Sequence, residues 1–384
     1  MTHALPARAR DRSPALAVLF ICALCACSAI GTSVAGASVS SSGWDAAQQR
    51  QVLAAGLMSD SAGGAFDAVG HLSGAEANAT MTALAARLQS AADEQVTSDE
   101  LQGANEQSAL GEQAVAAEAA APSAPAVPVA HTVQNTVTVA SFDGMLVEEL
   151  GLAAVAAHVQ ATAVAAGLQP PSYFGSEVVA RFLELRYEQP VGGQRFDLFP
   201  GEAITRAEAA WSLAKVMSLS SWSISSAEES LSAFALPQMS ATQRQALRIA
   251  VSRIGYPYVW GGTTDNTADG LEHGGFDCSG FAWRVYKVSG LPWGKEILGR
   301  TAAEQAGEIP QSQRLAASQL EPGDLLFFGS AHFNSKATES NVIHEGIYLG
   351  DNWVIHSSGQ GVYVLPLSGS WLGSSFAWGR RVIH

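Results

Sequence analysis

The feature that most constrains the fold of this chain is the order of segments after residue 241. Residues 243–254 carry apolar side chains on one helical face, and Tyr256-Pro257 ends that helix. Short strand-like segments follow at 325–328, 342–349, 353–356, 361–365 and 376–383. One or two helices followed by several antiparallel strands predict an α+β domain over residues 241–384.

The N-terminus has the pattern of an export signal. Arg8, Arg10 and Arg12 precede an apolar run over 15–30, and the small residues 35–37 offer a cleavage site. The run is shorter than the roughly 20 residues of a membrane-spanning helix. We therefore predict a signal peptide over 1–37 and a secreted or cell-envelope protein with no stable membrane span in the mature chain. A buried helix, or a lipoprotein signal with lipid on Cys27, are the alternatives.

Two further regions separate the signal from the α+β domain. Residues 38–130 are rich in Ala and Ser, and their only aromatic residues are Trp44 and Phe66. This composition predicts a spacer that is loosely helical or disordered, with too little apolar bulk for a core, and the proline-containing stretch 119–129 is typical of a linker. Residues 131–236 regain apolar side chains, and we predict a helical region there.

Part of this helical region resembles a known wall-binding module. In 196–201 and 204–208, Thr205 is placed as a helix cap with Glu208 three residues later. The stretch 172–219 is similar to the end of an S-layer homology module, a family that attaches proteins to cell-wall polysaccharide. The resemblance implies a polysaccharide partner. An ordinary helical hairpin with a capping box is the alternative, because at most one further degenerate copy precedes it.

Charge excludes nucleic acid as a partner. The net charge is −14, and the acidic excess lies before the α+β domain. Phosphate binding needs a basic patch, and the sequence shows none.

Cysteine usage draws attention to one residue. Of the 4 cysteines, Cys22, Cys25 and Cys27 lie in the predicted signal, so that cleavage leaves Cys278 alone. A lone cysteine cannot form a disulfide within the chain; it is either a buried small apolar residue or a reactive thiol. Asp277 is a good N-cap, and we predict a helix from Cys278 to about Gly290, with Phe281, Val285 and Val288 on one face. The helix dipole favours a thiolate, but Asp277 opposes it, so that a cationic neighbour is needed.

Two histidines are set to supply that neighbour. A three-residue hairpin loop at 350–352 pairs Leu349 with Trp353 and places Gly346 opposite His356. His344 and His356 then share one face of the sheet as diagonal neighbours, whereas a two-residue loop places them on opposite faces. In this hypothesis His344 takes the proton from Cys278, which gives a thiolate–imidazolium pair, and His356 orients His344.

These segments resemble a family of cell-wall cysteine endopeptidases, the NlpC type, which share a papain-like core. The resemblance covers about 244–384 and is carried by the blocks 255–262, 276–281, 322–328 and 344–350 together with 354–356. It implies a helix carrying the cysteine packed on an antiparallel sheet carrying the histidines. It also implies hydrolysis of peptidoglycan stem peptides, typically between D-γ-glutamyl and a diamino acid, by a triad of Cys278, His344 and His356. Tyr258 is expected beside the nucleophile, and Asp277 and Ser279 are expected to hold the amino end of the substrate.

The sequence also departs from this family. It has insertions at 263–275 and 329–341, and Glu345 replaces a small apolar residue beside the predicted base. His273 and His332 lie in the insertions, where we expect solvated side chains, and we predict neither a metal nor a cofactor. Two alternatives to the peptidase remain open: a non-catalytic wall-binding or adhesive protein, and an amidase or acyltransferase on the same core.

Overall fold

The computed structural model describes residues 45–60, 64–107, 136–187, 197–265 and 274–384. The predicted signal peptide and the linker at 119–129 lie outside these ranges, as does His273. Within them, no helix combines the length and the apolar character needed to cross a bilayer.

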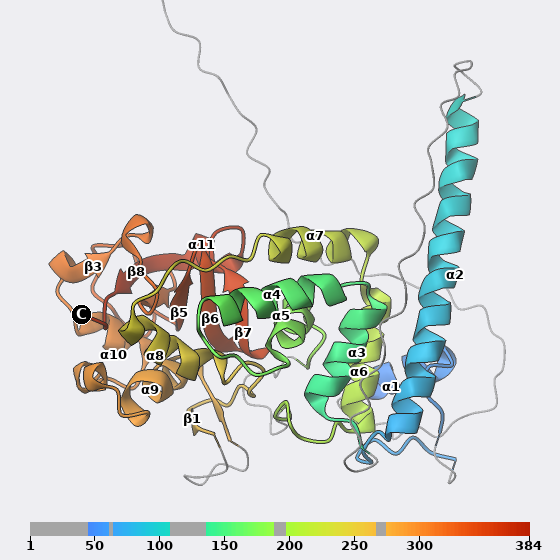
Figure 1. The fold of residues 1–384 in the computed structure, drawn as a ribbon, viewed down its shortest axis with the longest axis horizontal. Helices are drawn as coiled ribbons and strands as arrows, with labels where there is room; N and C mark the ends of the chain where they lie inside the picture. The colour runs from blue at the N-terminus through green and yellow to red at the C-terminus, as the bar shows by residue number, and fades with distance from the viewer. Residues whose placement is uncertain (1–44, 61–63, 108–135, 188–196, 266–273) are drawn as a thin grey trace, which may run out of the picture. The chain divides into compact units, whose positions relative to one another are not determined.

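A helical region precedes the α+β domain in the chain (Figure 1). Its helices are α1 (Ala46–Ala54), α2 (Gly74–Gln107), α3 (Val139–Glu149), α4 (Ala153–Ala165), α5 (Phe174–Phe182), α6 (Arg206–Ser218) and α7 (Ser221–Ser232). Helices α3 and α6 fall on two amphipathic stretches of the sequence, and Thr205 caps α6 by accepting a hydrogen bond from the Glu208 N–H at 3.2 Å.

The α+β domain is built on one six-stranded antiparallel sheet, and the predicted fold class is confirmed. The strands are β3 (Arg314–Leu315), β4 (Leu325–Phe328), β5 (His344–Gly350), β6 (Trp353–Ser358), β7 (Gly361–Pro366) and β8 (Phe376–Arg380). Their order in the sheet is β3-β8-β4-β5-β6-β7. The domain begins with α8 (Ala241–Val251), and β1 (Thr263–Thr264) and β2 (Gly275–Phe276) form a separate two-stranded sheet.

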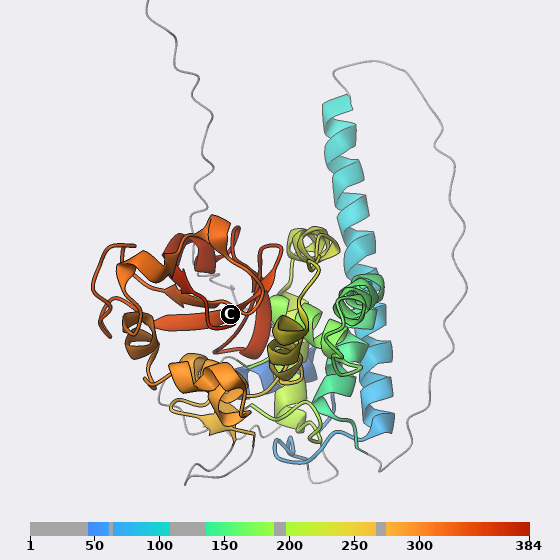
Figure 2. The same ribbon diagram turned by 60° about the vertical axis from the view of Figure 1, so that its left-hand side comes forward.

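The two faces of the six-stranded sheet are covered by different elements. Helix α9 (Cys278–Trp283) packs on β5 and β6, and its Phe281 joins the main core. The opposite face carries a smaller cluster around Phe328 and Leu372, under α11 (Trp371–Ser375). Helix α10 (Ala302–Gly307) lies between β2 and β3 in the chain. Figure 2 shows the strands, coloured orange to red, next to the green helices of the helical region, where α5 packs on β7.

The helix that begins at Cys278 changes form after one and a half turns. Helix α9 continues into a π-helical segment, η2 (Arg284–Val288), and Gly290 follows with φ of 72°. The wider turn moves the buried face by one position, so that Tyr286 is buried and Val288 is 47% exposed. The prediction that Val288 lies on the apolar face is therefore wrong.

Three helix starts in the helical region meet in a closed ring of backbone hydrogen bonds. The Leu72 N–H donates to the Ile204 carbonyl at 3.0 Å, and the Ile204 N–H donates to the Val137 carbonyl at 2.9 Å. The Val137 N–H completes the ring by donating to the Leu72 carbonyl at 3.0 Å. Three equivalent positions thus come from stretches far apart in the sequence, which is the arrangement of an internal threefold repeat.

The residue after each ring position caps the helix that follows. Ser73, Thr138 and Thr205 each accept a hydrogen bond from the backbone N–H three residues later, at the starts of α2, α3 and α6. The sequence pattern predicts one such start, at Thr205, and at most one degenerate copy before it. The other two were missed because only the cap hydroxyl and the preceding apolar residue are shared.

The first of the three starts lies in the stretch interpreted as a spacer. Val52, Leu72 and Leu84 are fully buried in the same core as α3 and α6. The expectation that 38–130 has too little apolar bulk for a core is therefore wrong for this part. Isolated apolar residues among alanines suffice because neighbouring segments supply the rest of the core.

Candidate active site

Cys278 is the first residue of α9. The Asp277 side chain caps the helix by accepting the Gly280 N–H at 2.6 Å, as predicted. Phe276 on β2 leads into the cap, and its N–H donates to the Pro257 carbonyl at 3.0 Å. Cys278 as a whole residue is partly exposed.

The β5–β6 hairpin reaches the predicted register by a different route. Gly346 lies opposite His356, as predicted, but Gly350 and not Leu349 pairs with Trp353. The loop has two residues, Asp351 and Asn352, with φ of 45° and 76°. These positive φ angles are typical of a tight hairpin turn. A bulge between Tyr348 and Gly350 adds the residue that restores the register.

His344 and His356 meet on one face of this hairpin. Nε2 of His344 lies 3.0 Å from Nδ1 of His356, and the rings are perpendicular with centroids 5.0 Å apart. A Cβ at Gly346 would lie 2.8 Å from Cγ1 of Val354 and 3.0 Å from Cβ of His356. Glycine is therefore needed there for the two imidazoles to approach. Because Nε2 of His344 faces His356, Nδ1 is the nitrogen left for a proton transfer.

Cys278 lies next to the strand that carries His344. Backbone N–H groups of Glu345 and Ser279 act on its sulfur and lower the pKa of the thiol. Burial and the charges of Glu345 and Asp277 outweigh them and raise the pKa of Cys278 to about 12. Burial lowers the pKa of His344 to about 3. Burial therefore disfavours the charged form of each of the two groups taken alone.

His356 stays neutral in this environment. It is fully buried, and burial followed by the influence of His344 lowers its pKa well below the ordinary value. Its Nε2 has no hydrogen-bond partner among the residues that the structure describes. A neutral His356 can accept a hydrogen bond from His344 and hold its tautomer.

Asp277 and Ser279 are joined by a residue that the sequence analysis missed. Arg300 binds both oxygens of Asp277, at 3.0 and 2.9 Å, and donates to the Ser279 hydroxyl at 2.9 Å. Asp277 also accepts the Gly261 N–H at 2.9 Å. Nothing in the spacing of Arg300 pointed to this contact, because the pairing is made by the fold. The predicted role of Asp277 and Ser279 in holding a substrate amine stays a prediction, and it has to share these oxygens with Arg300.

Tyr258 lies near the same thiol. Burial raises the pKa of its hydroxyl, and the charges of Cys278 and Asp277 raise it further. A backbone bridge between Tyr258 and Phe276 fixes the segment two residues before the cysteine. Tyr258, Cys278, Asp277 and Ser279 are therefore brought together.

Glu345 is a buried carboxyl beside these groups. Its side chain is fully buried, and neither carboxylate oxygen has a hydrogen-bond partner in the described part of the chain. Burial and then the charge of Asp277 raise the pKa of Glu345 to about 8, although Arg300 and Arg380 act in the opposite direction. A protonated Glu345 removes one negative charge from the neighbourhood of Cys278.

An exposed aromatic residue borders the histidine pair. The Trp371 ring lies 5.1 Å from that of His344 and 5.8 Å from that of His356, and its side chain is 45% exposed. It shields the hydrogen bond between the histidines on one side and offers an apolar surface beside it.

No group of three or more His, Cys, Asp or Glu side chains within the described ranges is placed to hold a metal ion. His332 is exposed in its loop, as expected for a solvated residue.

Comparison with known proteins places this site in a family. Residues 255–381, which lie within the α+β domain, match the family model described as the NlpC/P60 family. The chain is 32% identical over 135 residues to the bifunctional muramidase/DL-endopeptidase CwlT of Bacillus subtilis, covering 35% of each protein. It is 33% identical over 135 residues to the gamma-D-glutamyl-L-lysine dipeptidyl-peptidase of Bacillus cereus, covering 34% of this chain and 33% of that protein.

A solved structure of an NlpC/P60 family protein from Bacillus cereus is 27% identical, with a TM-score of 0.29, covering 40% of this chain and 43% of that one. The chain thus spans about a third of the length of the curated relatives described above.

Proposed function

We propose that the protein is an exported cysteine endopeptidase that hydrolyses peptide bonds in peptidoglycan stem peptides. The observation that carries the proposal is the 3.0 Å contact between His344, on the strand β5 that borders Cys278, and His356 on β6. The family of the domain and the endopeptidase names of its relatives support the same reaction class.

In this mechanism Cys278 is the nucleophile. Its proton passes to Nδ1 of His344 as the sulfur attacks the carbonyl carbon, so that the thiolate and the imidazolium form together. His344 then donates that proton to the leaving amine, which leaves a thioester on Cys278. A water molecule, deprotonated by His344, hydrolyses the thioester, releases a carboxylate and restores the thiol. His356 accepts the hydrogen bond from Nε2 of His344 throughout.

The bond that we propose is cut joins D-γ-glutamyl to a diamino acid. One relative is named a gamma-D-glutamyl-L-lysine dipeptidyl-peptidase and another a DL-endopeptidase. In the proposed complex Tyr258 lies beside the scissile bond, and Asp277 and Ser279 hold the amino end of the stem peptide next to Arg300.

The proposal is tested by mass spectrometry of purified peptidoglycan digested with wild-type protein and with Cys278→Ala. We expect new peptide termini at D-γ-glutamyl only with the wild type. Products cut at an amide other than a stem-peptide bond, or products of acyl transfer, would point to an amidase or acyltransferase instead. Alkylation of Cys278 by iodoacetamide separates catalysis from a purely adhesive role. An unreactive thiol in folded protein at neutral pH would contradict the nucleophile assignment.

A second function is proposed for the helical region, namely binding of cell-wall polysaccharide through residues 172–219 and their repeats. The threefold ring of helix starts favours it, because the module that 172–219 resembles commonly occurs in threes. A cavity of about 200 Å³ lies between the first and third starts, lined by Leu72, Glu76 and Arg206 among others. Arg206 is nearly buried there and binds Glu76 at 2.6 Å.

This second function is tested by co-sedimentation of full-length Cys278→Ala with purified walls, with and without their polysaccharide. We expect Arg206→Lys to weaken sedimentation, and Lys215→Gln on the same helix to leave it unchanged. If equal amounts of protein sediment with intact walls and with walls stripped of polysaccharide, the assignment is contradicted.

A further inference from the structure

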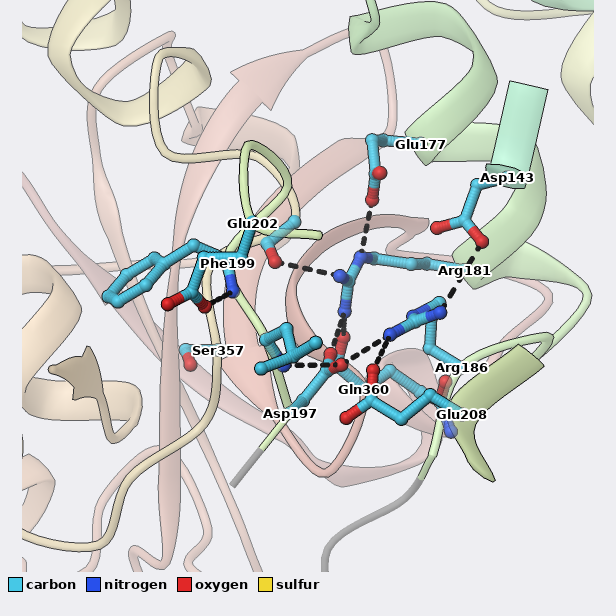
Figure 3. Close-up of polar contacts among 12 residues, drawn as sticks. Asp143, Glu177, Arg181, Arg186, Asp197, Phe199, Glu202, Glu208, Ser357 and Gln360 are labelled. Atoms are coloured by element: carbon cyan, nitrogen blue, oxygen red, sulfur yellow. Dashed lines mark hydrogen bonds and ion pairs between the residues drawn. The ribbon is translucent and has the colours of Figure 1, made fainter. Parts of the chain in front are cut away.

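A buried cluster of charged side chains connects the helical region to the α+β domain (Figure 3). At its centre is Arg181 on α5, whose side chain is fully buried. Its Nε binds Glu177 at 2.8 Å, and one terminal nitrogen binds Asp197 at 3.3 Å. These carboxylates belong to the helical region and balance the charge of Arg181.

The remaining donors of Arg181 reach into the α+β domain. One terminal nitrogen donates to the Gly255 carbonyl at 2.7 Å, and the other donates to the Gln360 carbonyl. Both acceptors are backbone atoms of loops. A guanidinium has five donors in a fixed plane, so that a single side chain can hold two loops in one relative position.

The two loops that Arg181 holds are paired with each other. The Gly255 N–H donates to the Val362 carbonyl, and the Val362 N–H donates to the Tyr256 carbonyl, each at 2.8 Å. A Cβ at Gly361 would lie 2.4 Å from the Tyr256 carbonyl oxygen and 2.8 Å from Arg181. The junction therefore has no space for a side chain larger than glycine at this position.

Each loop leads within a few residues to the candidate active site. Gly255 precedes Tyr258, which is bridged to Phe276 next to the nucleophile helix. Gln360 ends the turn after β6, the strand of His356 and Ser357. The Ser357 hydroxyl donates to the Phe276 carbonyl at 2.7 Å, so that both routes from Arg181 converge on the residue two before Cys278.

We propose that Arg181 is a positioning residue for the peptidase reaction, and that the helical region is a working part of the catalytic unit. Arg181 on α5 binds two backbone carbonyls and thereby sets the distance between two parts of the site. One part is the segment that contains Tyr258 and Cys278, and the other is the strand that carries His356. This inference rests on the proposed function, because it assigns a consequence for the same three-residue site.

Arg186 offers a matched control within the same cluster. It is also buried, and it binds Asp197 at 2.7 Å and Glu208 at 2.8 Å, all within the helical region. Arg181→Gln and Arg186→Gln each leave Asp197 without one guanidinium. Only the first removes contacts to the α+β domain.

The experiment compares these two full-length variants with the wild type, at a temperature at which circular dichroism shows that all three are folded. The readouts are kcat and KM on a stem peptide containing the D-γ-glutamyl–diamino acid bond, and the rate of Cys278 alkylation by iodoacetamide. We expect Arg181→Gln to lower kcat about 10- to 100-fold, because small misplacements of catalytic groups cost rates of that order. We expect neither the KM nor the alkylation rate of Arg181→Gln to change by a larger factor than its kcat. The kcat of Arg186→Gln should stay within about twofold of the wild-type value.

Wild-type kcat and alkylation rate in folded Arg181→Gln would overturn the proposal, as would equal losses in the two variants. If Arg181→Gln does not fold, Arg181→Lys, which keeps the charge but has one donor nitrogen in place of three, takes its place with the same criteria. If the wild type releases no product, the proposed function has failed. The alkylation rates then still decide whether Arg181 shapes the surroundings of Cys278.

Discussion

The helical region and the α+β domain bury ionisable groups in different surroundings. Around Arg181 and Arg186, each buried carboxylate lies beside at least one guanidinium, and Asp197 lies between both (Figure 3). In the candidate active site, Glu345 and His356 are fully buried with unpartnered polar atoms. The first arrangement cross-links segments that are far apart in the sequence. Burial raises carboxyl pKa values in both arrangements, that of Asp143 in the first and that of Glu345 in the second. In the second, the shifted groups lie beside a cysteine and a histidine pair, and a shifted pKa is what a proton-transfer site requires.

This contrast teaches where each kind of substitution should act. Removing one member of a paired buried set leaves an uncompensated charge and costs stability. Removing an unpaired buried group relieves the free-energy cost of burying it, but it also removes the chemical step in which the group takes part. This division predicts that substitutions in the charged cluster act mainly on stability and that substitutions in the candidate active site act mainly on activity.

The largest effect is expected for His344→Ala. Loss of the proposed general base should lower kcat by at least about 10³-fold. The free energy of unfolding should fall by only about 1–3 kcal/mol, because Nδ1 of the buried His356 loses its partner. Stem-peptide hydrolysis and urea unfolding, measured on one preparation, check this. His332→Ala, in an exposed loop, is the control. A variant that loses stability in proportion to its activity would contradict the division.

Asp197→Asn should act on stability first. It removes the carboxylate shared by Arg181 and Arg186, and we expect a loss of about 3–5 kcal/mol in the free energy of unfolding. The urea midpoint measures it, with exposed Glu339→Gln as control. A midpoint equal to that of the wild type would show that the cluster does not hold the helical region together.

Gly346→Ala should disturb the histidine pair directly. The new methyl group meets Val354 and His356, and forcing it in should cost about 1–3 kcal/mol of stability and lower kcat about tenfold. Gly201→Ala, where a Cβ meets nothing within 4 Å, is the matched control. Unchanged kcat would mean that the hydrogen bond between the histidines tolerates displacement.

Glu345→Gln should have its effect only at alkaline pH. The pKa of Glu345 is raised to about 8, so that the carboxyl is protonated at pH 7 and charged at pH 9. The charged form raises the pKa of Cys278, and we expect wild-type activity to fall about tenfold between pH 7 and pH 9, and the variant to keep it. Rate–pH profiles of hydrolysis check this, and superimposable profiles would refute it.

The same substitution has a consequence for stability. The folded protein retains the Glu345 proton between about pH 4.5 and 8, whereas the unfolded chain has released it, so that stability falls as pH rises through this window. In Glu345→Gln this loss should disappear, which thermal unfolding at pH 5 and pH 8 measures. Glu304→Gln, at an exposed capping position, is the control.

Several features of the site could be predicted from local sequence. The cap at Asp277, the helix at Cys278, the strands from β4 to β8 and the pairing of Gly346 with His356 depend on neighbours within one hairpin or one helical turn. The register was right although the loop was wrong, because the bulge after Tyr348 compensates for the shorter turn. Side-chain periodicity indicates which face of the sheet a residue occupies. It does not indicate which combination of turn and bulge produces that register.

The sequence by itself determined the local elements and the choice of candidate catalytic residues, because helix caps, strand alternation and a lone cysteine are short-range properties. Only the tertiary structure decided which distant charges meet. The contacts of Arg300 with Asp277, of Arg181 with Gly255 and Gln360, and the ring of Leu72, Val137 and Ile204 join segments that no local pattern relates. The physical reason is that a buried charge or backbone amide takes whichever partner the packing brings to it, and that partner is chosen by the whole fold.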